Sequence, residues 1–153
     1  MPNDTSLAEL LEAEHRAIDA GIEEYTGDSP GGEAALTEAI DALRRHIYLE
    51  EEFCFDALRE RGLMMPVMVM LREHGEIWTV CDAVADAIAA GTEATDAAAS
   101  LLTMLEVHNS KEEPILYPHI AEAIGPDASA DLLDFLETGT MPDGWVCAAA
   151  AAG

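Results

Sequence analysis

The chain is poor in aromatic residues, in basic residues and in cysteine, and each shortage narrows what it can be. Aromatic residues make up 5% of the 153 residues, and valine, isoleucine and threonine are thin beside alanine, leucine and glutamate. This balance favours helix over sheet. The length is that of one domain, and the apolar half of the composition is enough for a single core.

Basic residues are the scarcest charged class. Lysine and arginine total 7 against 31 aspartates and glutamates, which gives a formal net charge of −24, and Lys111 is the only lysine. A surface this acidic repels nucleic acid and anionic membranes, so we expect neither as a partner. We interpret the excess acid as a heavily solvated surface, with an acidic docking face as the weaker alternative.

Long apolar runs and a cysteine framework are also missing. The first residues, MPNDTSLAELLEAEH, contain neither the basic nor the apolar region of a signal peptide, and the longest apolar run, LMMPVMVML, is too short to span a bilayer. The three cysteines are odd in number and lack CxxC spacing, which is typical of reduced thiols. We therefore predict a soluble, cytoplasmic protein.

What the chain does have is helical periodicity. Apolar residues recur every three or four positions and predict helices over about residues 6–25, 32–61, 65–90 and 96–124, with a short further helix over about 128–137. Short connections make neighbouring helices antiparallel. The predicted fold is all-α, an up-down-up-down four-helix bundle with a short C-terminal extra helix. Residues 1–138 would form this domain, and the low-complexity tail 139–153 is predicted to be disordered, apart from a docked Trp145.

Four of the five histidines fall one per long helix, each on the apolar face: His15, His46, His74 and His108. Glu50 follows His46 by four residues, and Glu112 follows His108 by four, which puts each pair on one helix face about 6 Å apart along the axis. The pattern is internally doubled, because EHR and HIYLEE in the first half correspond to EHG and HNSKEE in the second. Two such halves facing each other would bring their polar side chains to one level.

These inward-facing polar groups need a partner. A single histidine on an apolar face is more often an ordinary core residue, but two glutamates and four histidines exceed what one core network holds. Basic residues are nearly absent from these faces, so a metal cation is the simplest neutralising charge. Imidazole suits Zn, Fe, Cu and Ni, and bridging carboxylates favour a pair of Fe or Mn ions. We predict two metal ions that share Glu50 and Glu112, take two histidines each, and keep positions open for a small molecule.

The His…HisxxxGlu…His…HisxxxGlu pattern, over about residues 7–124, resembles the hemerythrin-like (HHE cation-binding) family. The phrase EExxxYP, from Glu112 to Pro118, also resembles family usage. The resemblance implies a four-helix bundle around a non-haem centre of two Fe ions, bridged by an oxo or hydroxo group and by carboxylates, with Zn or Mn as substitutes. The implied metal ligands are His15, His46, Glu50, His74, His108 and Glu112. Family members bind O2 or respond to peroxide, NO or iron.

One position departs from the oxygen-carrying hemerythrins. Those proteins have a second histidine one turn after the first on the third helix, where this chain has Trp78. The change opens a coordination position or leaves room for Glu51, Glu73 or water. It favours peroxide chemistry, redox chemistry or sensing over reversible O2 carriage.

Three functional hypotheses follow from the sequence. The first is a di-iron protein that binds O2, peroxide or NO, whose enzymatic version would have a catalase- or peroxidase-like activity. The second is a metal-binding or metal-regulated interaction module without redox catalysis. The third is a purely structural acidic bundle.

Several residues near the predicted ligands are expected to play other roles. His119 lies eleven residues after His108, roughly 16 Å along a straight helix, so we predict a structural or surface residue. Cys54 is predicted to be a buried thiol one turn beyond Glu50. Pro114 should bend its helix just after the ligands. The hydroxyls of Tyr48 and Tyr117 are candidates for hydrogen bonds at the site.

Four glutamates sit directly beside the predicted ligands in the sequence: Glu14, Glu51, Glu73 and Glu113. We expect them to point sideways into solvent, with a hydrogen bond to a ligand as the alternative.

Overall fold

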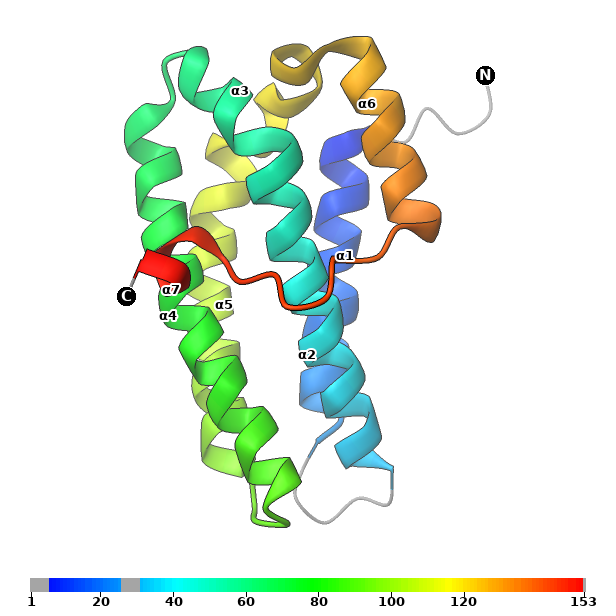
Figure 1. Ribbon diagram of the computed structural model, residues 1–153, viewed down its shortest axis with the longest axis vertical. Coiled ribbons are helices and arrows are strands. Elements are labelled where there is room, and N and C mark those ends of the chain that lie inside the picture. The colour runs from blue at the N-terminus through cyan, green and yellow to red at the C-terminus, as the bar shows by residue number, and fades with distance from the viewer. Residues whose placement is uncertain (1–5, 26–30, 153) are drawn as a thin grey trace.

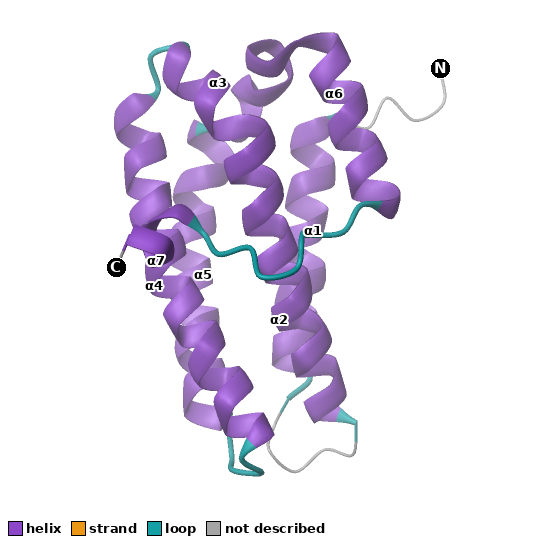
Figure 2. Cartoon of the chain, in the orientation of Figure 1, coloured by secondary structure: helices purple, strands orange, loops and turns teal. Residues whose placement is uncertain are grey.

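The computed structural model describes residues 6–25 and 31–152, and over these residues it contains helices and no strand (Figure 2). The prediction of an all-α protein is therefore confirmed. The helices are α1 (Leu7–Glu23), α2 (Gly32–Leu49), α3 (Phe55–Glu60), α4 (Met64–Ala89), α5 (Thr95–Ile115), α6 (Ile120–Thr138) and α7 (Ala148–Ala152). A π-helical turn, Glu50–Cys54, joins α2 to α3, and a 3₁₀ turn, Tyr117–His119, joins α5 to α6.

Four rods lie side by side along the long axis: α1, α2 with its continuation into α3, α4 and α5 (Figure 1). Helix α1 packs against α2 and α5, and α4 packs against α5 and α2. Each rod thus has two neighbours, an arrangement consistent with the four-helix bundle of hemerythrins. No helix within the described ranges combines the length and apolar character needed to cross a membrane.

The buried apolar side chains form two separate clusters along the bundle. One includes Ile18, Leu43 and Leu101 and lies toward the α4–α5 turn, and the other includes Leu11 and Val67 and lies toward α3 and α6. Six buried histidines and glutamates belong to neither cluster. The core is therefore divided by a polar layer.

The second predicted helix is interrupted by a π-helical turn. Its regular part ends at Leu49, and within Glu50–Cys54 the chain widens so that the Phe55 N–H donates to the Glu50 carbonyl five residues back. Such π turns are rare and occur often at functional sites. The periodicity of the apolar residues predicted a single helix to residue 61, because one wide turn hardly disturbs that pattern.

The fourth predicted helix ends earlier than expected. Pro114 lies inside α5, yet the helix continues to Ile115, and the break comes at the 3₁₀ turn that contains Pro118. Helix α6 then starts at Ile120 rather than near residue 128, and it is kinked at Gly125, whose φ of 86° and ψ of 173° are non-helical. A left-handed φ suits glycine, and Pro126 follows it, so the kink is encoded locally.

The C-terminal segment follows a defined path, in contrast to the disorder predicted from its composition. From Gly139 it crosses α2 and ends as α7 against α4 (Figure 1). Cys147 is fully buried, and Trp145 packs on Trp78 with ring centroids 5.6 Å apart. The docking of Trp145 was predicted; the burial of Cys147 was hidden by the alanine-rich sequence around it. The domain boundary at residue 138 stays a prediction.

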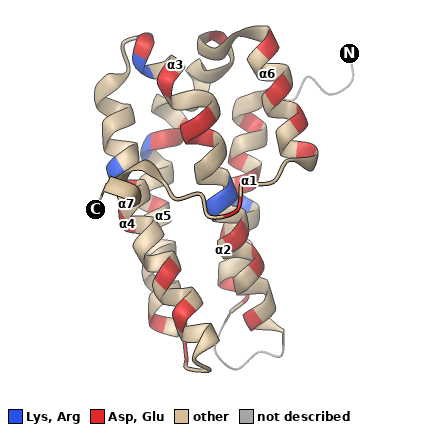
Figure 3. Cartoon of the chain, in the orientation of Figure 1, with Lys and Arg blue, Asp and Glu red and all other residues tan. Residues whose placement is uncertain are grey.

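Charge is distributed unevenly along the bundle. No lysine or arginine occurs between Arg16 and Arg44 or between Arg72 and Lys111. The described parts of these stretches include the end of the bundle that holds the α4–α5 turn, and there the charged bands are all acidic (Figure 3). Of the basic residues, Arg44 reaches toward that end and pairs with Asp82, whereas Arg59 and Arg61 lie on the side of α3 and α6.

Candidate metal centre

The six predicted ligands meet in the polar layer, and all six are buried: His15, His46, Glu50, His74, His108 and Glu112. Their donor atoms form two sets, and within each set all atoms lie within 4.8 Å of one another. The first set is His15, His46, Glu50 and Glu112, and the second is His74, His108, Glu50 and Glu112. The two glutamates belong to both.

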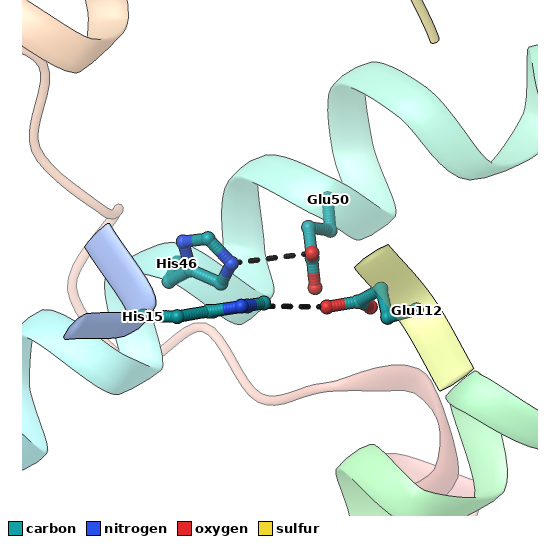
Figure 4. A group of neighbouring side chains, drawn as sticks. All are labelled: His15, His46, Glu50 and Glu112. Carbon is teal, nitrogen blue, oxygen red and sulfur yellow. Dashed lines mark ion pairs between the residues drawn. The ribbon is translucent and has the colours of Figure 1, made fainter. Parts of the chain in front are cut away.

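In the first set, a histidine from α1 and one from α2 face the two carboxylates (Figure 4). His15 Nε2 lies 3.3 Å from Glu112 Oε1, and His46 Nε2 lies 3.2 Å from Glu50 Oε2. The Tyr117 hydroxyl stands among all four. It is 2.8 and 2.9 Å from the two histidine nitrogens, and 2.7 and 3.0 Å from the Glu50 and Glu112 oxygens.

In the second set, no hydroxyl of the described residues fills the centre. His74 Nε2 lies 3.2 Å from Glu50 Oε1 and 3.9 Å from Glu112 Oε2, and His108 Nε2 lies 3.3 Å from the same Glu112 oxygen. Yet the His74 nitrogen and these two carboxylate oxygens have no hydrogen-bond partner within residues 6–25 and 31–152. Buried polar atoms are rarely left so, because each costs about 1–3 kcal/mol. A cation is the partner that such a converging set of donors fits.

The two glutamates divide their oxygens between the sets. Glu50 turns Oε2 to the first set and Oε1 to the second, and Glu112 turns Oε1 to the first and Oε2 to the second. Each glutamate therefore contributes one oxygen to each set. This arrangement arises because Glu50 begins the π turn and Glu112 lies in the last turns of α5, on opposite sides of the bundle axis.

Every histidine of the two sets turns Nε2 inward and uses Nδ1 to bond a glutamate of a neighbouring helix. The four pairs are His15–Glu113 at 2.7 Å, His46–Glu14 at 2.8 Å, His74–Glu51 at 2.7 Å and His108–Glu73 at 2.9 Å. Such pairs fix the ring orientation and raise the basicity of a metal-binding imidazole. The solvent-facing expectation for these glutamates is wrong, because each bonds one of the four histidines that the sequence predicts as ligands.

Among known families, the hemerythrin HHE cation-binding domain matches residues 6–120 of the chain, which include both donor sets. The chain belongs to this family. No curated protein and no solved structure matches the chain. The family relationship establishes a cation-binding domain, and the donor chemistry of this hemerythrin-like protein fits it: four imidazole nitrogens and four carboxylate oxygens suit iron, and also zinc or manganese.

The donors hold one another through charge. Burial alone would lower the pKa of His46, but the Glu50 and Glu14 carboxylates outweigh it and raise that pKa to about 10. Burial likewise opposes the charged form of His74, but the Glu50 carboxylate beside Nε2 and the Glu51 carboxylate bonded to Nδ1 raise its pKa to about 9. Burial would raise the pKa of Glu112, but the adjacent His108 holds it well below its usual value. Protons on His46 and His74 thus supply positive charge beside the buried carboxylates.

The two halves of the internal duplication differ at one informative position. Tyr117 follows His108 by nine residues, and Phe55 follows His46 by nine. The Tyr117 hydroxyl enters the first donor set, while the Phe55 ring stacks on His74 of the second set at 5.4 Å. The hemerythrin-like centre is therefore asymmetric. The sequence made Tyr117 a candidate without placing its hydroxyl; the offset from the HisxxxGlu motif was the available signal.

The remaining candidates lie outside both donor sets. The Trp78 ring packs against Trp145 and lies beneath the Arg44 guanidinium, and it belongs to the apolar cluster toward the α4–α5 turn. Glu51 and Glu73 each bond a histidine Nδ1 and belong to neither donor set.

Two further residues stand as predicted. Cys54 is a buried thiol, and burial together with the Glu50 and Glu112 charges raises its pKa well above the ordinary value. His119 is exposed at the end of the 3₁₀ turn.

Replacing Tyr117 by Phe is expected to lower the free energy of unfolding of the metal-free protein by about 1–3 kcal/mol. The change removes the O–H that serves the Glu50 and Glu112 carboxylates and leaves both with less hydrogen bonding in a buried site. Urea denaturation followed by circular dichroism measures the effect. Tyr48→Phe is the matched control, since the Tyr48 hydroxyl has no hydrogen bond among the described residues. Equal stability of the two variants would contradict the assigned role.

Proposed function

We propose that the protein is a non-haem di-iron protein that binds O2, peroxide or NO at a carboxylate-bridged two-metal centre. The observation that carries the proposal is the sharing of Glu50 and Glu112 by two buried donor sets, each completed by two histidines. One ion would take His15 and His46, and the other His74 and His108. When bound, the two ions would supply Lewis acidity, redox change and open coordination positions.

Residues around the two donor sets hold the donor atoms in the orientation that metal binding needs. The glutamates bonded to Nδ1 hold each imidazole with Nε2 inward, so little reorganisation is needed when a cation enters. Apolar clusters on both sides exclude water from the layer. The Tyr117 hydroxyl is an O–H donor inside the first set, and it can hold a proton at the Tyr117 oxygen beside a small bound molecule.

Trp78 stands where the oxygen-carrying hemerythrins have a histidine, and this difference supports peroxide chemistry or sensing over oxygen carriage. An enzymatic version of this function would consume hydrogen peroxide with a catalase- or peroxidase-like activity. Iron-loaded protein that leaves peroxide unconsumed would remove that version. A near-ultraviolet band that comes and goes with O2 would support a carrier or sensor instead.

The test of the metal centre is metal analysis of protein purified from iron-supplemented cells. We expect about two Fe per chain, as in bundle di-metal sites that use inward carboxylates and histidines, together with ligand-to-metal bands in the near ultraviolet. Protein that contains no metal after this treatment would contradict the proposal.

The second candidate is a metal-regulated interaction module. The observation in its favour is that the donors are deeply buried between two apolar clusters, where a metal would stabilise the fold strongly. A large rise in melting temperature with metal, without reactivity toward peroxide, O2 or NO, would favour this candidate.

With the di-iron function we propose the up-down-up-down order of helices. Short connections support it, since only residues 61–63 separate α3 from α4 and residues 90–94 separate α4 from α5. A cytoplasmic location remains part of the proposal, supported by three cysteines that are free and buried.

A further inference from the structure

The four glutamates that bond the histidine Nδ1 atoms are not equally covered. The Glu14, Glu73 and Glu113 side chains are 24%, 16% and 19% exposed, and each lines a surface cavity, of about 530, 250 and 430 Å³ respectively. The Glu51 side chain is only 5% exposed. What covers Glu51 is the C-terminal strap, residues 139–152.

The strap bonds Glu51 directly. One carboxylate oxygen of Glu51 accepts the His74 Nδ1 hydrogen at 2.7 Å, and the other accepts the Ala148 backbone N–H at 3.0 Å. Ala148 is the first residue of α7, so its N–H lacks a partner within that helix and is free for Glu51. The Glu51 carboxylate is therefore held between the metal-binding layer and the C-terminal strap.

The strap is anchored on both sides of this contact. Arg45 of α2 donates from Nε to the Gly139 carbonyl at 2.9 Å, which fixes where the strap begins. The Trp145 indole packs on Trp78 and donates to Glu52 at 3.3 Å. Cys147, next to Ala148, is fully buried in the core cluster that also contains Trp78.

Helix α7 lies unusually close to α4 beside the same histidine. A Cβ placed on Gly75, the residue after His74, would be 2.8 Å from the Ala149 Cβ. Glycine at this position lets the two backbones approach, and any larger residue pushes α7 away from α4. The strap thus packs against α4 only because residue 75 is glycine, and this packing places the Ala148 N–H within hydrogen-bond distance of Glu51.

We propose that the C-terminal strap is a positioning element for the second donor set, which holds Glu51 and through it the His74 imidazole, so that strap docking and metal binding promote each other. The proposal rests on the metal centre described above. If docking raises the affinity for metal, metal must raise the stability of docking by the same factor, because the coupling free energy is reciprocal. A strap that only covers the surface would not respond to metal.

The first experiment titrates the full-length Gly75→Leu variant with Zn²⁺ by calorimetry, because Zn²⁺ avoids oxidation. We expect one of two ions to bind about 10–100-fold more weakly, the usual effect of disturbing a group that orients a metal ligand. The matched control is Arg72→Leu, which adds the same side chain at an exposed position on α4, where loss of the 3.8 Å Arg72–Glu76 pair costs little. Wild-type affinities in Gly75→Leu would overturn the proposal while leaving the metal centre intact.

The second experiment needs no substitution. Amide hydrogen exchange of residues 139–152 is compared in wild-type protein with and without Zn²⁺, and acrylamide quenching of tryptophan fluorescence is followed in parallel. We expect slower exchange at Ala148 and weaker quenching when metal is bound. Two bound ions with unchanged exchange in the strap would overturn the positioning role, and no bound ion in the wild type would overturn both this proposal and the metal centre.

Discussion

Replacing Glu112 by Gln is expected to deprive the protein of both metal ions at once. One Glu112 oxygen lies 3.3 Å from His15 Nε2 in the first donor set, and the other lies 3.3 Å from His108 Nε2 in the second. A glutamine has nearly the same shape but keeps only one oxygen, and its NH2 group does not bind a cation. We expect affinity at both positions to fall by more than about 100-fold, beyond the range for residues that only orient a ligand.

The comparison that sharpens this prediction is His15→Ala. His15 belongs to the first set alone, so that variant is expected to lose one ion and to keep the ion of His74 and His108. Glu106→Gln, an exposed substitution on the same helix, controls for the loss of a negative charge on α5. Metal stoichiometry of all three, with circular dichroism to verify folding, makes the test. A Glu112→Gln protein that still holds two ions would show that the carboxylate does not bridge.

The second large effect is an opposite pH dependence of stability and metal affinity. In the metal-free protein the pKa values of His46 and His74 are raised from 6.5 to about 10 and about 9. The folded state therefore binds more protons than the unfolded state between these limits. The stabilisation is fully present below pH 6.5 and is lost as the pH rises toward 9 and 10. Each tenfold change in a proton-binding constant is worth about 1.4 kcal/mol of folding free energy.

The carboxylates set the acid limit. The pKa values of Glu50 and Glu112 are lowered from 4.5, so their stabilisation is present above pH 4.5 and is lost as the pH falls below it. Urea denaturation of metal-free protein should thus give maximum stability between pH 4.5 and 6.5. A stability that keeps rising from pH 7 to 9 would contradict this assignment.

Metal affinity should change in the other direction over the same interval. A cation needs neutral imidazole, so binding at pH 7 must displace the protons held by His46 and His74. Calorimetric titration with Zn²⁺ in buffers of different ionisation enthalpy measures the protons released. Release should be clear at pH 7 and should diminish toward pH 10, while a binding reaction without proton release would contradict the charged state of the metal-free site.

The sequence predicted which six polar side chains are buried together, because helical periodicity determines which residues share an inward face. His46 and Glu50 are four residues apart, as are His108 and Glu112. Each pair therefore shares a helix face even when the predicted helix ends are wrong by a few residues. The partners of the histidines were not predictable in the same way. Glu113 meets His15 only because α5 and α1 pack at a particular rotation, and no one-helix pattern contains that rotation.

The other features that the sequence did not predict arise where the backbone departs from regular α-helix or where the strap docks. The π turn at Glu50 and the 3₁₀ turn at Tyr117 each change the direction of side chains by amounts that a regular helix does not predict. The second of these turns brings the Tyr117 hydroxyl into the first donor set. The strap escaped prediction because alanine carries no strong signal, and its place depends on Gly75, a residue 73 positions before Ala148 whose importance lies in lacking a side chain.

The four pairs between a histidine Nδ1 and a glutamate link each rod of the bundle to the next, so they constrain the order in which the site can form during synthesis. These links join residues 23 to 98 positions apart, and the longest, His15 with Glu113, connects the first long helix to α5. A nascent chain that has not yet emerged past Glu113 can bury neither donor set completely. Long-range links of this kind form late, because chain closure must precede the gain from the contact. Iron could then bind only after the whole bundle has been synthesised.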